Sequence, residues 1–249
     1  MAQPATDPQA EPAHWALIPC AGRGTRATKE GPKQYQPILG NPLLHYTIKA
    51  FESVGAIRQV VVAIAPDDTQ FRQLLLGTPG KTVGINCGGP TRALTVANGL
   101  SWLAQHGAQP QDWVLVHDAA RCLITPEQIK RLIATCHADA VGGLLAAPLP
   151  DTLKQAVPGD PARVMATLER QDRWLAQTPQ MFRLGTLLQA MAHSGAEVTD
   201  EASAVEALGL APRLVASGTA NFKVTYADDF DTAAAVLQHR LSQTSGAGP

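Results

Sequence analysis

A glycine-rich, basic stretch follows a short apolar run near the start of the chain: "ALIPCAGRGTRATKEGPKQY", from Ala16 to Tyr35. The apolar residues that lead into it, 15–19, are typical of a strand buried inside a sheet. Gly22 and Gly24 come next, and residues 23–33 carry four cations. Glycines let backbone N–H groups approach phosphate oxygens, and nearby cations neutralise a bound phosphate. The stretch therefore predicts a strand that leads into a phosphate-binding loop.

Three kinds of phosphate-binding loop compete for this stretch. Residues 22–27 satisfy the dinucleotide fingerprint G-x-G-x-x-A, but that motif requires an acidic strand end about 20 residues later. The next expected strand ends only near Asp67. A P-loop requires G-x-x-x-x-G-K-[ST], which this loop does not contain. A long basic loop of the nucleotidyltransferase type fits best, because Arg26 and Lys33 would supply full charges to a phosphorus under attack. The alternative is a loop of merely solvated surface cations.

The composition excludes several classes of protein. The 249 residues carry 20 Lys and Arg against 21 Asp and Glu, and this net charge of −1 predicts no nucleic-acid or membrane partner. The four scattered cysteines form no C-x-x-C pair, so neither a zinc knuckle nor a redox motif is expected. No apolar run approaches the length of a membrane span, and the first residues lack the features of a signal peptide. We therefore expect a soluble, cytoplasmic protein.

Short apolar strands alternate with helical stretches through most of the chain. This pattern predicts an α/β fold with a mostly parallel, Rossmann-like sheet and helices on both faces, and ligands at the carboxyl ends of the strands. After Pro148 the turn sequence VPGDP predicts a protruding β-hairpin arm, which should pack on a second copy of the chain because an isolated hairpin is marginal in water. The expected organisation is a disordered leader (1–13), a single nucleotidyltransferase domain (14–241) with a dimerisation arm (149–172), and a disordered tail (242–249).

Several elements are expected at particular positions. The acids at the start of 67–76 indicate a helix there, and a last helix is expected over 228–241. Short strands are expected near 214–216 and 222–225. The loops that begin at Cys20, Gly88 and Asp118 each follow an expected strand, so they should meet at one edge of the sheet.

A series of short motifs occurs in the order in which one enzyme family has them. They are PCAGRGTR…GPKQY (19–35), GGPTRALTV (88–96), VHDAAR (116–121), DTLK (151–154), TPQMF (178–182), TDEAS (199–203) and NFKVT (221–225). From about Trp15 to Leu241 the chain thus resembles the 2-C-methyl-D-erythritol 4-phosphate cytidylyltransferases of the non-mevalonate isoprenoid pathway. The resemblance implies that the phosphate of methylerythritol phosphate attacks the α-phosphorus of CTP and releases pyrophosphate, with Mg²⁺ bridging the triphosphate.

The resemblance also implies roles for individual residues. Arg26 and Lys33 would stabilise the transition state, and Arg170 and Lys223 would orient the attacking phosphate. The residues implied in nucleotide binding are Pro19, Cys20, Ala21, Gly22, Gly24, Gly88, Gly89, Arg92, Thr95, Asp118 and Ala119. The residues implied in binding the acceptor are Arg121, Thr152, Thr178 and Thr199.

Two of these assignments carry further consequences. Asp118 follows a buried strand, and it stays open whether its carboxylate approaches Mg²⁺, faces the acceptor or only caps a turn. His117 beside it is expected to be structural. Thr152 and Arg170 lie on the expected arm, so the resemblance implies that they complete the site of a neighbouring subunit. A homodimer would then be necessary for activity.

Two other functions stay open at this stage. The same fold could use another polyol phosphate, such as ribitol 5-phosphate, as the acceptor, and the residues around Thr152, Thr199 and Lys223 would decide between the two. The chain could also be a catalytically silent nucleotide-binding or scaffold protein. Retention of all four expected catalytic cations argues against that alternative.

Overall fold

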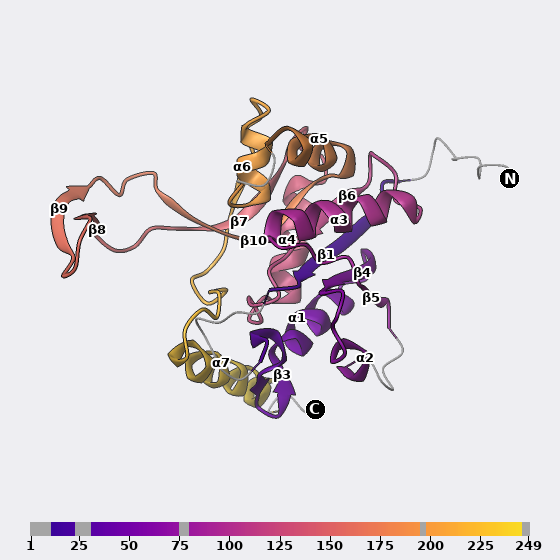
Figure 1. Ribbon diagram of the computed structural model, residues 1–249, viewed down its shortest axis with the longest axis horizontal. Coiled ribbons are helices and arrows are strands. Elements are labelled where there is room, and N and C mark those ends of the chain that lie inside the picture. Colours follow the sequence, from indigo (N-terminus) through magenta and orange to yellow (C-terminus); the bar gives the residue numbers. More distant parts are fainter. Residues whose placement is uncertain (1–10, 23–30, 75–79, 195–197, 246–249) are drawn as a thin grey trace, which may run out of the picture.

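A seven-stranded sheet forms the centre of the computed structural model, which describes residues 11–22, 31–74, 80–194 and 198–245 (Figure 1). Its strand order is β11-β7-β10-β6-β1-β4-β5. The pairs are parallel except those of β10, which runs antiparallel to both β6 and β7. The predicted mostly parallel α/β fold is confirmed. The strands are β1 (His14–Cys20), β4 (Ile57–Ile64), β5 (Thr82–Ile85), β6 (Trp113–Val116), β7 (Gly142–Pro148), β10 (Trp174–Arg183) and β11 (Arg213–Ala216).

The strand β1 has apolar side chains on both faces of the sheet. Successive side chains of a strand point to opposite faces, and accordingly Ala16 and Ile18 belong to one buried cluster while Trp15 and Leu17 belong to another. The first cluster is covered by α1 (Leu43–Glu52) and α4 (Pro126–Cys136), and the second by α3 (Arg92–Gln105), α5 (Leu184–Ser194) and α6 (Glu201–Glu206). Burial on both faces explains why the strand reads as a continuous apolar run.

The predicted arm is present as a two-stranded antiparallel hairpin. Its strands are β8 (Leu153–Val157) and β9 (Arg163–Leu168), which pair with each other and project far from the central sheet (Figure 1). Most side chains of the arm are exposed. The large apolar side chains that stay exposed on and beside the arm are Val157, Val164, Met165, Leu168, Trp174 and Leu175.

Some element predictions were wrong. The helix expected over 67–76 is the short α2 (Phe71–Leu74), because the Asp68 carboxylate accepts hydrogen bonds from the N–H groups of Gln70 and Phe71 and delays the helix start. Residues 75–79 lie outside the described residues. The last helix, α7 (Asp228–Ser245), extends beyond the expected end at Leu241.

Two further corrections concern strands. Residues 222–225 form no strand, because the Val224 N–H instead bonds the carbonyl of Ala120 in a loop. The strand β10, which lies between β6 and β7, was not predicted. Its residues Gln177 and Gln180 are buried although they are polar, so the sequence lacks the continuous apolar run of a buried strand. The remaining short elements are η1 (Lys33–Tyr35), β2 (Pro37–Ile38) and β3 (Asn41–Pro42). The described helices include none that is long and apolar enough to cross a bilayer.

Candidate active site

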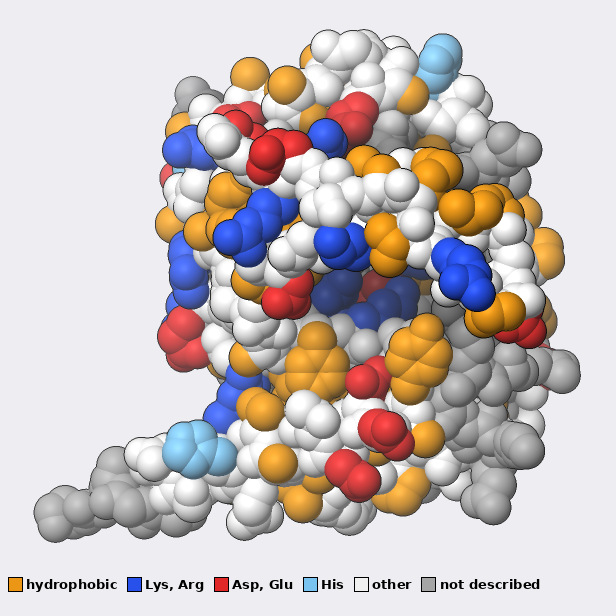
Figure 2. Space-filling view, turned by 90° about the vertical axis from the view of Figure 1, so that its left-hand side faces the viewer, with side chains coloured by type: hydrophobic (Ala, Val, Ile, Leu, Met, Phe, Trp, Pro, Cys, Tyr) orange, Lys and Arg blue, Asp and Glu red, His pale blue; other side chains and the backbone are white. Residues whose placement is uncertain are grey.

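A cavity of about 500 Å³ lies at the carboxyl ends of the parallel strands, where the loops after β1, β5 and β6 meet. Figure 2 shows Lys and Arg side chains gathered around a central hollow, with acidic and apolar side chains near its rim. The cavity is large enough for a small-molecule ligand. The predicted site residues that line it are Pro19, Cys20, Ala21, Gly22, Lys33, Gly89, Arg92, Thr95, Asp118, Ala119 and Lys223.

The other predicted residues, apart from Gly88, fall in three groups. Arg26 and Gly24 lie outside the described residues, so their roles stay predictions. A smaller hollow that shares Arg92, Asp118 and Lys223 with the main cavity is lined by Arg121, Thr178 and Thr199. Thr152 and Arg170 lie together on the arm, in a third hollow that shares no residue with these two, and the Arg170 guanidinium donates to the carbonyl of Pro150.

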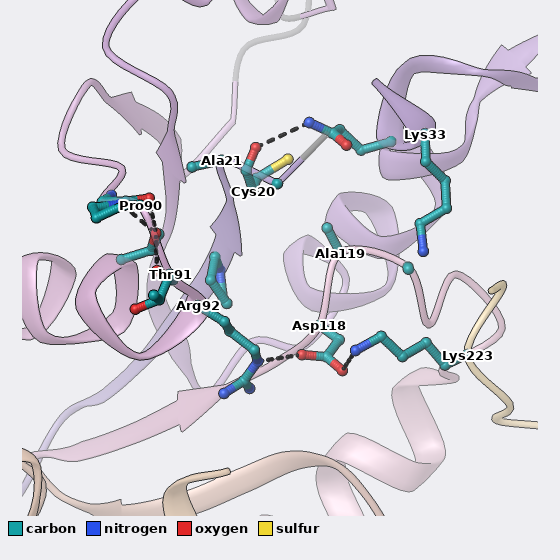
Figure 3. A pocket seen from close by; sticks show the side chains of 15 residues that line it. Cys20, Ala21, Lys33, Pro90, Thr91, Arg92, Asp118, Ala119 and Lys223 are labelled. Carbon is teal, nitrogen blue, oxygen red and sulfur yellow. Dashed lines mark hydrogen bonds and ion pairs between the residues drawn. The ribbon is translucent and has the colours of Figure 1, made fainter. Parts of the chain in front are cut away.

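The carboxylate of Asp118 connects two cations from distant parts of the chain. Its Oδ1 lies 2.8 Å from Arg92 Nε, and its Oδ2 lies 2.8 Å from Lys223 Nζ. Figure 3 shows this row of three side chains along the cavity, with the Lys33 amine also directed towards the cavity. A third cation, Arg121, approaches Asp118 Oδ2 at 3.9 Å. A single carboxylate thus fixes the positions of the cations on this side.

Glu201, which the sequence analysis did not single out, holds Arg92 from the other side. Its two carboxylate oxygens accept from the Arg92 guanidinium at 2.7 and 3.0 Å, and its side chain is 1% exposed. This planar two-point pairing fixes the orientation of an arginine. An acid in the first turn of a helix normally complements the helix dipole, and nothing in the sequence connects it to an arginine 109 positions away.

The charges of this cluster do not cancel. Among the groups joined by ion pairs, the three cations Arg92, Arg121 and Lys223 outnumber the two anions Asp118 and Glu201 by one. Asp200 also lines the smaller hollow, where its carboxylate accepts a hydrogen bond from the Gln180 amide at 2.8 Å. Burial alone would raise the pKa of Asp118, but Arg92 and Lys223 outweigh it and hold that pKa well below its usual range. The carboxylate therefore stays ionised, and the cluster suits an anionic ligand.

The loop after β5 is held in place by a threonine and a glycine. Thr95, at 2% exposed, accepts from the Gly89 N–H at 3.0 Å and donates to the Thr91 carbonyl at 2.9 Å. Gly88 does not line the cavity. It lies against β4 instead, with its N–H donating to the carbonyl of Ile64 at 2.9 Å. Thr95 and Gly88 thus shape the loop that presents Gly89 to the cavity, and a contact of the Thr95 hydroxyl with a base stays a prediction.

The opposite wall of the cavity comes from η1 and the end of β1. The Lys33 amine donates to the carbonyl of Val224 at 2.6 Å, and the Gln34 amide donates to the carbonyl of Cys20 at 3.0 Å. The first bond connects the segment after the basic loop to the segment that carries Lys223, and the second connects it to the end of β1. Burial raises the pKa of the Cys20 thiol well above its usual range, so the thiol stays protonated and is a poor nucleophile.

The described residues offer no metal site made of protein ligands alone. Among them, no group of three or more His, Cys, Asp and Glu side chains is placed to hold a metal ion. Asp118 is the only carboxylate among the described residues that line the main cavity, and cations already occupy both of its oxygens. This donor set fits a divalent cation whose ligands come mainly from a phosphate ligand and water.

Comparisons with known proteins agree with one another. The family model described as IspD, 2-C-methyl-D-erythritol 4-phosphate cytidylyltransferase, matches residues 14–239. A 2-C-methyl-D-erythritol 4-phosphate cytidylyltransferase of Paraburkholderia phymatum is 48% identical over 90% of this chain and 95% of the relative. A bifunctional enzyme IspD/IspF of Albidiferax ferrireducens is 56% identical over 97% of this chain, which spans only 57% of that relative. A crystal structure of 4-diphosphocytidyl-2C-methyl-D-erythritol synthase superposes with a TM-score of 0.81 at 39% identity, and the match covers 92% of this chain and all of that one.

Substitution of Gly88 by alanine is expected to destabilise the fold. A Cβ on Gly88 would overlap the Cβ of Ala21 and lie 2.8 Å from the backbone oxygen of Ile64, which cannot move aside. We expect urea unfolding of G88A to show a loss of about 1–3 kcal/mol in the free energy of unfolding. The matched control is G55A, because a Cβ on Gly55 meets nothing within 4 Å. Equal stabilities of G88A and G55A would contradict this packing.

Low pH is expected to reduce the free energy of unfolding, because the buried His117 is neutral in the folded protein. The imidazole is fully buried against the Phe51 ring, and this burial lowers the pKa of His117 to about 3. An unfolded histidine has a pKa of about 6.5, so below that pH the unfolded state binds more protons. Stability should therefore fall as the pH drops from about 6.5, by up to about 1.4 kcal/mol per pH unit. Urea unfolding at several pH values measures this slope.

The control for this pH dependence is H117F, which should lose the share of the slope that His117 contributes. Burial also lowers the pKa of His14, so part of the slope is expected to persist. A slope of the same size in H117F would assign the acid sensitivity to other groups.

Proposed function

Because the chain belongs to the family of 2-C-methyl-D-erythritol 4-phosphate cytidylyltransferases, we propose that its cavity joins CTP to 2-C-methyl-D-erythritol 4-phosphate. The products are 4-diphosphocytidyl-2-C-methyl-D-erythritol and pyrophosphate, in isoprenoid precursor synthesis. The observation that supports this best is the row of Arg92, Asp118 and Lys223, which forms a wall common to the main cavity and the smaller hollow. In this proposal the nucleotide occupies the main cavity and the acceptor phosphate occupies the smaller hollow.

The reaction brings two anions together, and the cations reduce their repulsion. An oxygen of the acceptor phosphate attacks the α-phosphorus of CTP, a new P–O bond forms, and the bond to the β-phosphate oxygen breaks as pyrophosphate leaves. Positive groups placed around the phosphorus stabilise the charge that spreads over its oxygens. We assign this role to Lys33, to Arg26 of the basic loop and to Lys223, with the Lys33 amine directed into the cavity.

The acceptor needs no general base. A phosphate monoester loses its second proton near pH 6, so its oxygen is already an anion at neutral pH. The protein therefore has to orient the acceptor rather than deprotonate it. Arg121, Thr199 and Lys223 face the smaller hollow and are proposed to contribute to this orientation. The fully buried His117 has no contact with either ligand in this scheme.

Mg²⁺ is proposed to enter the site bound to the triphosphate of CTP. Mg²⁺ keeps several water and phosphate ligands and commonly takes only one or two carboxylates from a protein. The described lining, with a single carboxylate that is already paired, fits an ion carried mainly by the substrate. When bound, the ion would neutralise part of the triphosphate charge. Lys33 and the backbone of residues 20–22 would then position the nucleotide.

A homodimer is the second part of the proposal. Arg170 and Thr152 lie on an arm whose apolar side chains are exposed, and their hollow shares no residue with the main cavity of the same chain. An arm from a second copy would cover those apolar side chains and bring Arg170 to the partner's acceptor phosphate. The guanidinium of an arginine can hold two phosphate oxygens at once. We propose that this dimer works in the cytoplasm, where CTP is available.

The decisive assay incubates the full chain with CTP and Mg²⁺ and either methylerythritol phosphate or ribitol 5-phosphate. We expect pyrophosphate release and a cytidine diphosphate product with methylerythritol phosphate. A product only from ribitol 5-phosphate would make the chain a cytidylyltransferase with another acceptor. No pyrophosphate from either acceptor would favour a silent nucleotide-binding protein.

Loss of the Lys33 amine is expected to slow the reaction strongly. We expect K33A to lower kcat by about 10³-fold, equivalent to about 4 kcal/mol of transition-state stabilisation. Steady-state pyrophosphate release measures the change. The matched control is K130A, because Lys130 is exposed on α4 and lines none of the hollows described above. Near-normal turnover by K33A would remove Lys33 from the mechanism.

Mixed dimers test whether the site is shared between subunits. R170A and K33A should each be nearly inactive, but a hybrid dimer has one site with both residues intact. With free exchange half of the dimers are hybrids, so the mixture should regain about a quarter of the wild-type activity. The control is a mixture of two stocks of R170A. If exchange is confirmed and the mixture stays inactive, sharing across subunits is wrong.

A further inference from the structure

A buried histidine and a threonine hydroxyl form a chain of hydrogen bonds beside the loop that carries Asp118 and Arg121. His117 is fully buried and Thr178, on β10, is 4% exposed. The Asp118 N–H lies 3.0 Å from Thr178 Oγ1, Thr178 Oγ1 lies 3.0 Å from His117 Nδ1, and His117 Nε2 lies 3.2 Å from the carbonyl oxygen of Arg121. The chain thus begins and ends on the backbone of residues 118–121.

The chemistry of the end groups fixes the direction of each bond. The Arg121 carbonyl can only accept, so His117 Nε2 carries the proton and donates it. In a neutral ring Nδ1 is then an acceptor, and the Thr178 hydroxyl donates its proton to it. The Asp118 N–H can only donate, so it uses a lone pair of Thr178 Oγ1.

The surroundings of His117 favour the neutral ring. The imidazole packs on the Phe51 ring, with 5.1 Å between ring centroids, and its two nitrogens bond to a hydroxyl and a backbone carbonyl rather than to a carboxylate. Burial lowers the pKa of His117 to about 3, which outweighs the opposing effect of the Asp118 charge. A buried cation without a paired anion would be costly.

This arrangement leaves the Thr178 hydroxyl without a proton for a ligand. Its single hydrogen is donated to His117, and only a lone pair remains free. A lone pair repels a phosphate oxygen instead of binding it. Thr178 therefore cannot donate a hydrogen bond to an acceptor phosphate, which is the contact that its place in the motif TPQMF implies, although it lines the smaller hollow.

We propose that His117 and Thr178 are positioning residues, which act on the reaction only by holding the 118–121 loop. The proposal rests on the proposed function, because it assumes that Asp118 and Arg121 serve the acceptor side. The loop orients Asp118 towards Lys223, and it directs the Arg121 guanidinium to the carbonyl of Asn221 at 2.8 Å. Small misplacements of such groups can cost about 10²-fold in rate.

The first test observes the proton positions and requires no catalysis. Long-range ¹H–¹⁵N spectra of the full chain at pH 7.5 distinguish a neutral ring protonated at Nε2 from one protonated at Nδ1 and from the charged ring. The His117 signal is assigned by its shift in T178V. We expect the neutral Nε2–H form. A charged ring, or a proton on Nδ1, would free the Thr178 proton for a ligand and overturn the proposal.

The second test is a double-mutant cycle on the acceptor kinetics. T178V keeps the shape of the side chain without its hydroxyl, and T178S keeps the hydroxyl as the matched control. We expect T178V and H117F each to lower kcat/KM for methylerythritol phosphate by about tenfold or more, and T178S to recover most of the loss. Because the two residues act through one chain of bonds, the double variant should be no worse than about the poorer single variant.

Direct contact between Thr178 and the acceptor would give a different result. The two losses would then multiply in the double variant, and that outcome overturns the proposal. Thermal unfolding of every variant separates loss of the fold from loss of positioning, and H117Q replaces H117F in the cycle if the phenylalanine variant does not fold. If the wild type releases no pyrophosphate, the proposed function fails, while the NMR test still decides the proton positions.

Discussion

The ion pairs of Asp118 organise the cationic side of the cavity. Arg92 comes from α3, Lys223 from the segment before α7 and Arg121 from the loop after β6, and like charges would drive these side chains apart. One ionised carboxylate at 2.8 Å from two of them offsets that repulsion. Partly exposed pairs of this kind add little net stability, but removal of a cation leaves the largely buried Asp118 carboxylate less well compensated. The main effect of the cluster is therefore to hold the charged side chains in position, and it contributes little to the stability of the fold.

The fold serves this cluster by bringing loops to one edge. A parallel sheet delivers the ends of β1, β5 and β6 to the same side, and the two apolar clusters on its faces keep the strands in place. Side chains that are far apart in the sequence, such as Arg92 and Glu201, meet there. The arm differs from the sheet, because its two strands pair only with each other and leave apolar side chains exposed to solvent.

Much of the sheet and the position of its loops could be predicted from the sequence. Strands buried on both faces appear as continuous apolar runs, and the glycine-rich motifs mark where they end. The strand β10 could not be predicted, because its buried glutamines bond to other buried groups and look polar in a linear reading. The roles of Gly88 and Glu201 also escaped prediction, because each depends on a packing or pairing partner outside its own motif. Local patterns identified many of the residues that line the cavity, and which of them touch a ligand stays a prediction.

The pairing of Lys223 with Asp118 also affects which ions can enter. An anion that approaches Lys223 has to compete with a carboxylate already in contact with it. A weakly held monovalent ion such as chloride gains too little from that exchange, whereas a doubly charged phosphate ester that also meets Arg121 gains more. If the smaller hollow holds the acceptor phosphate as proposed, this built-in counter-ion would favour a doubly charged ester over small monovalent anions.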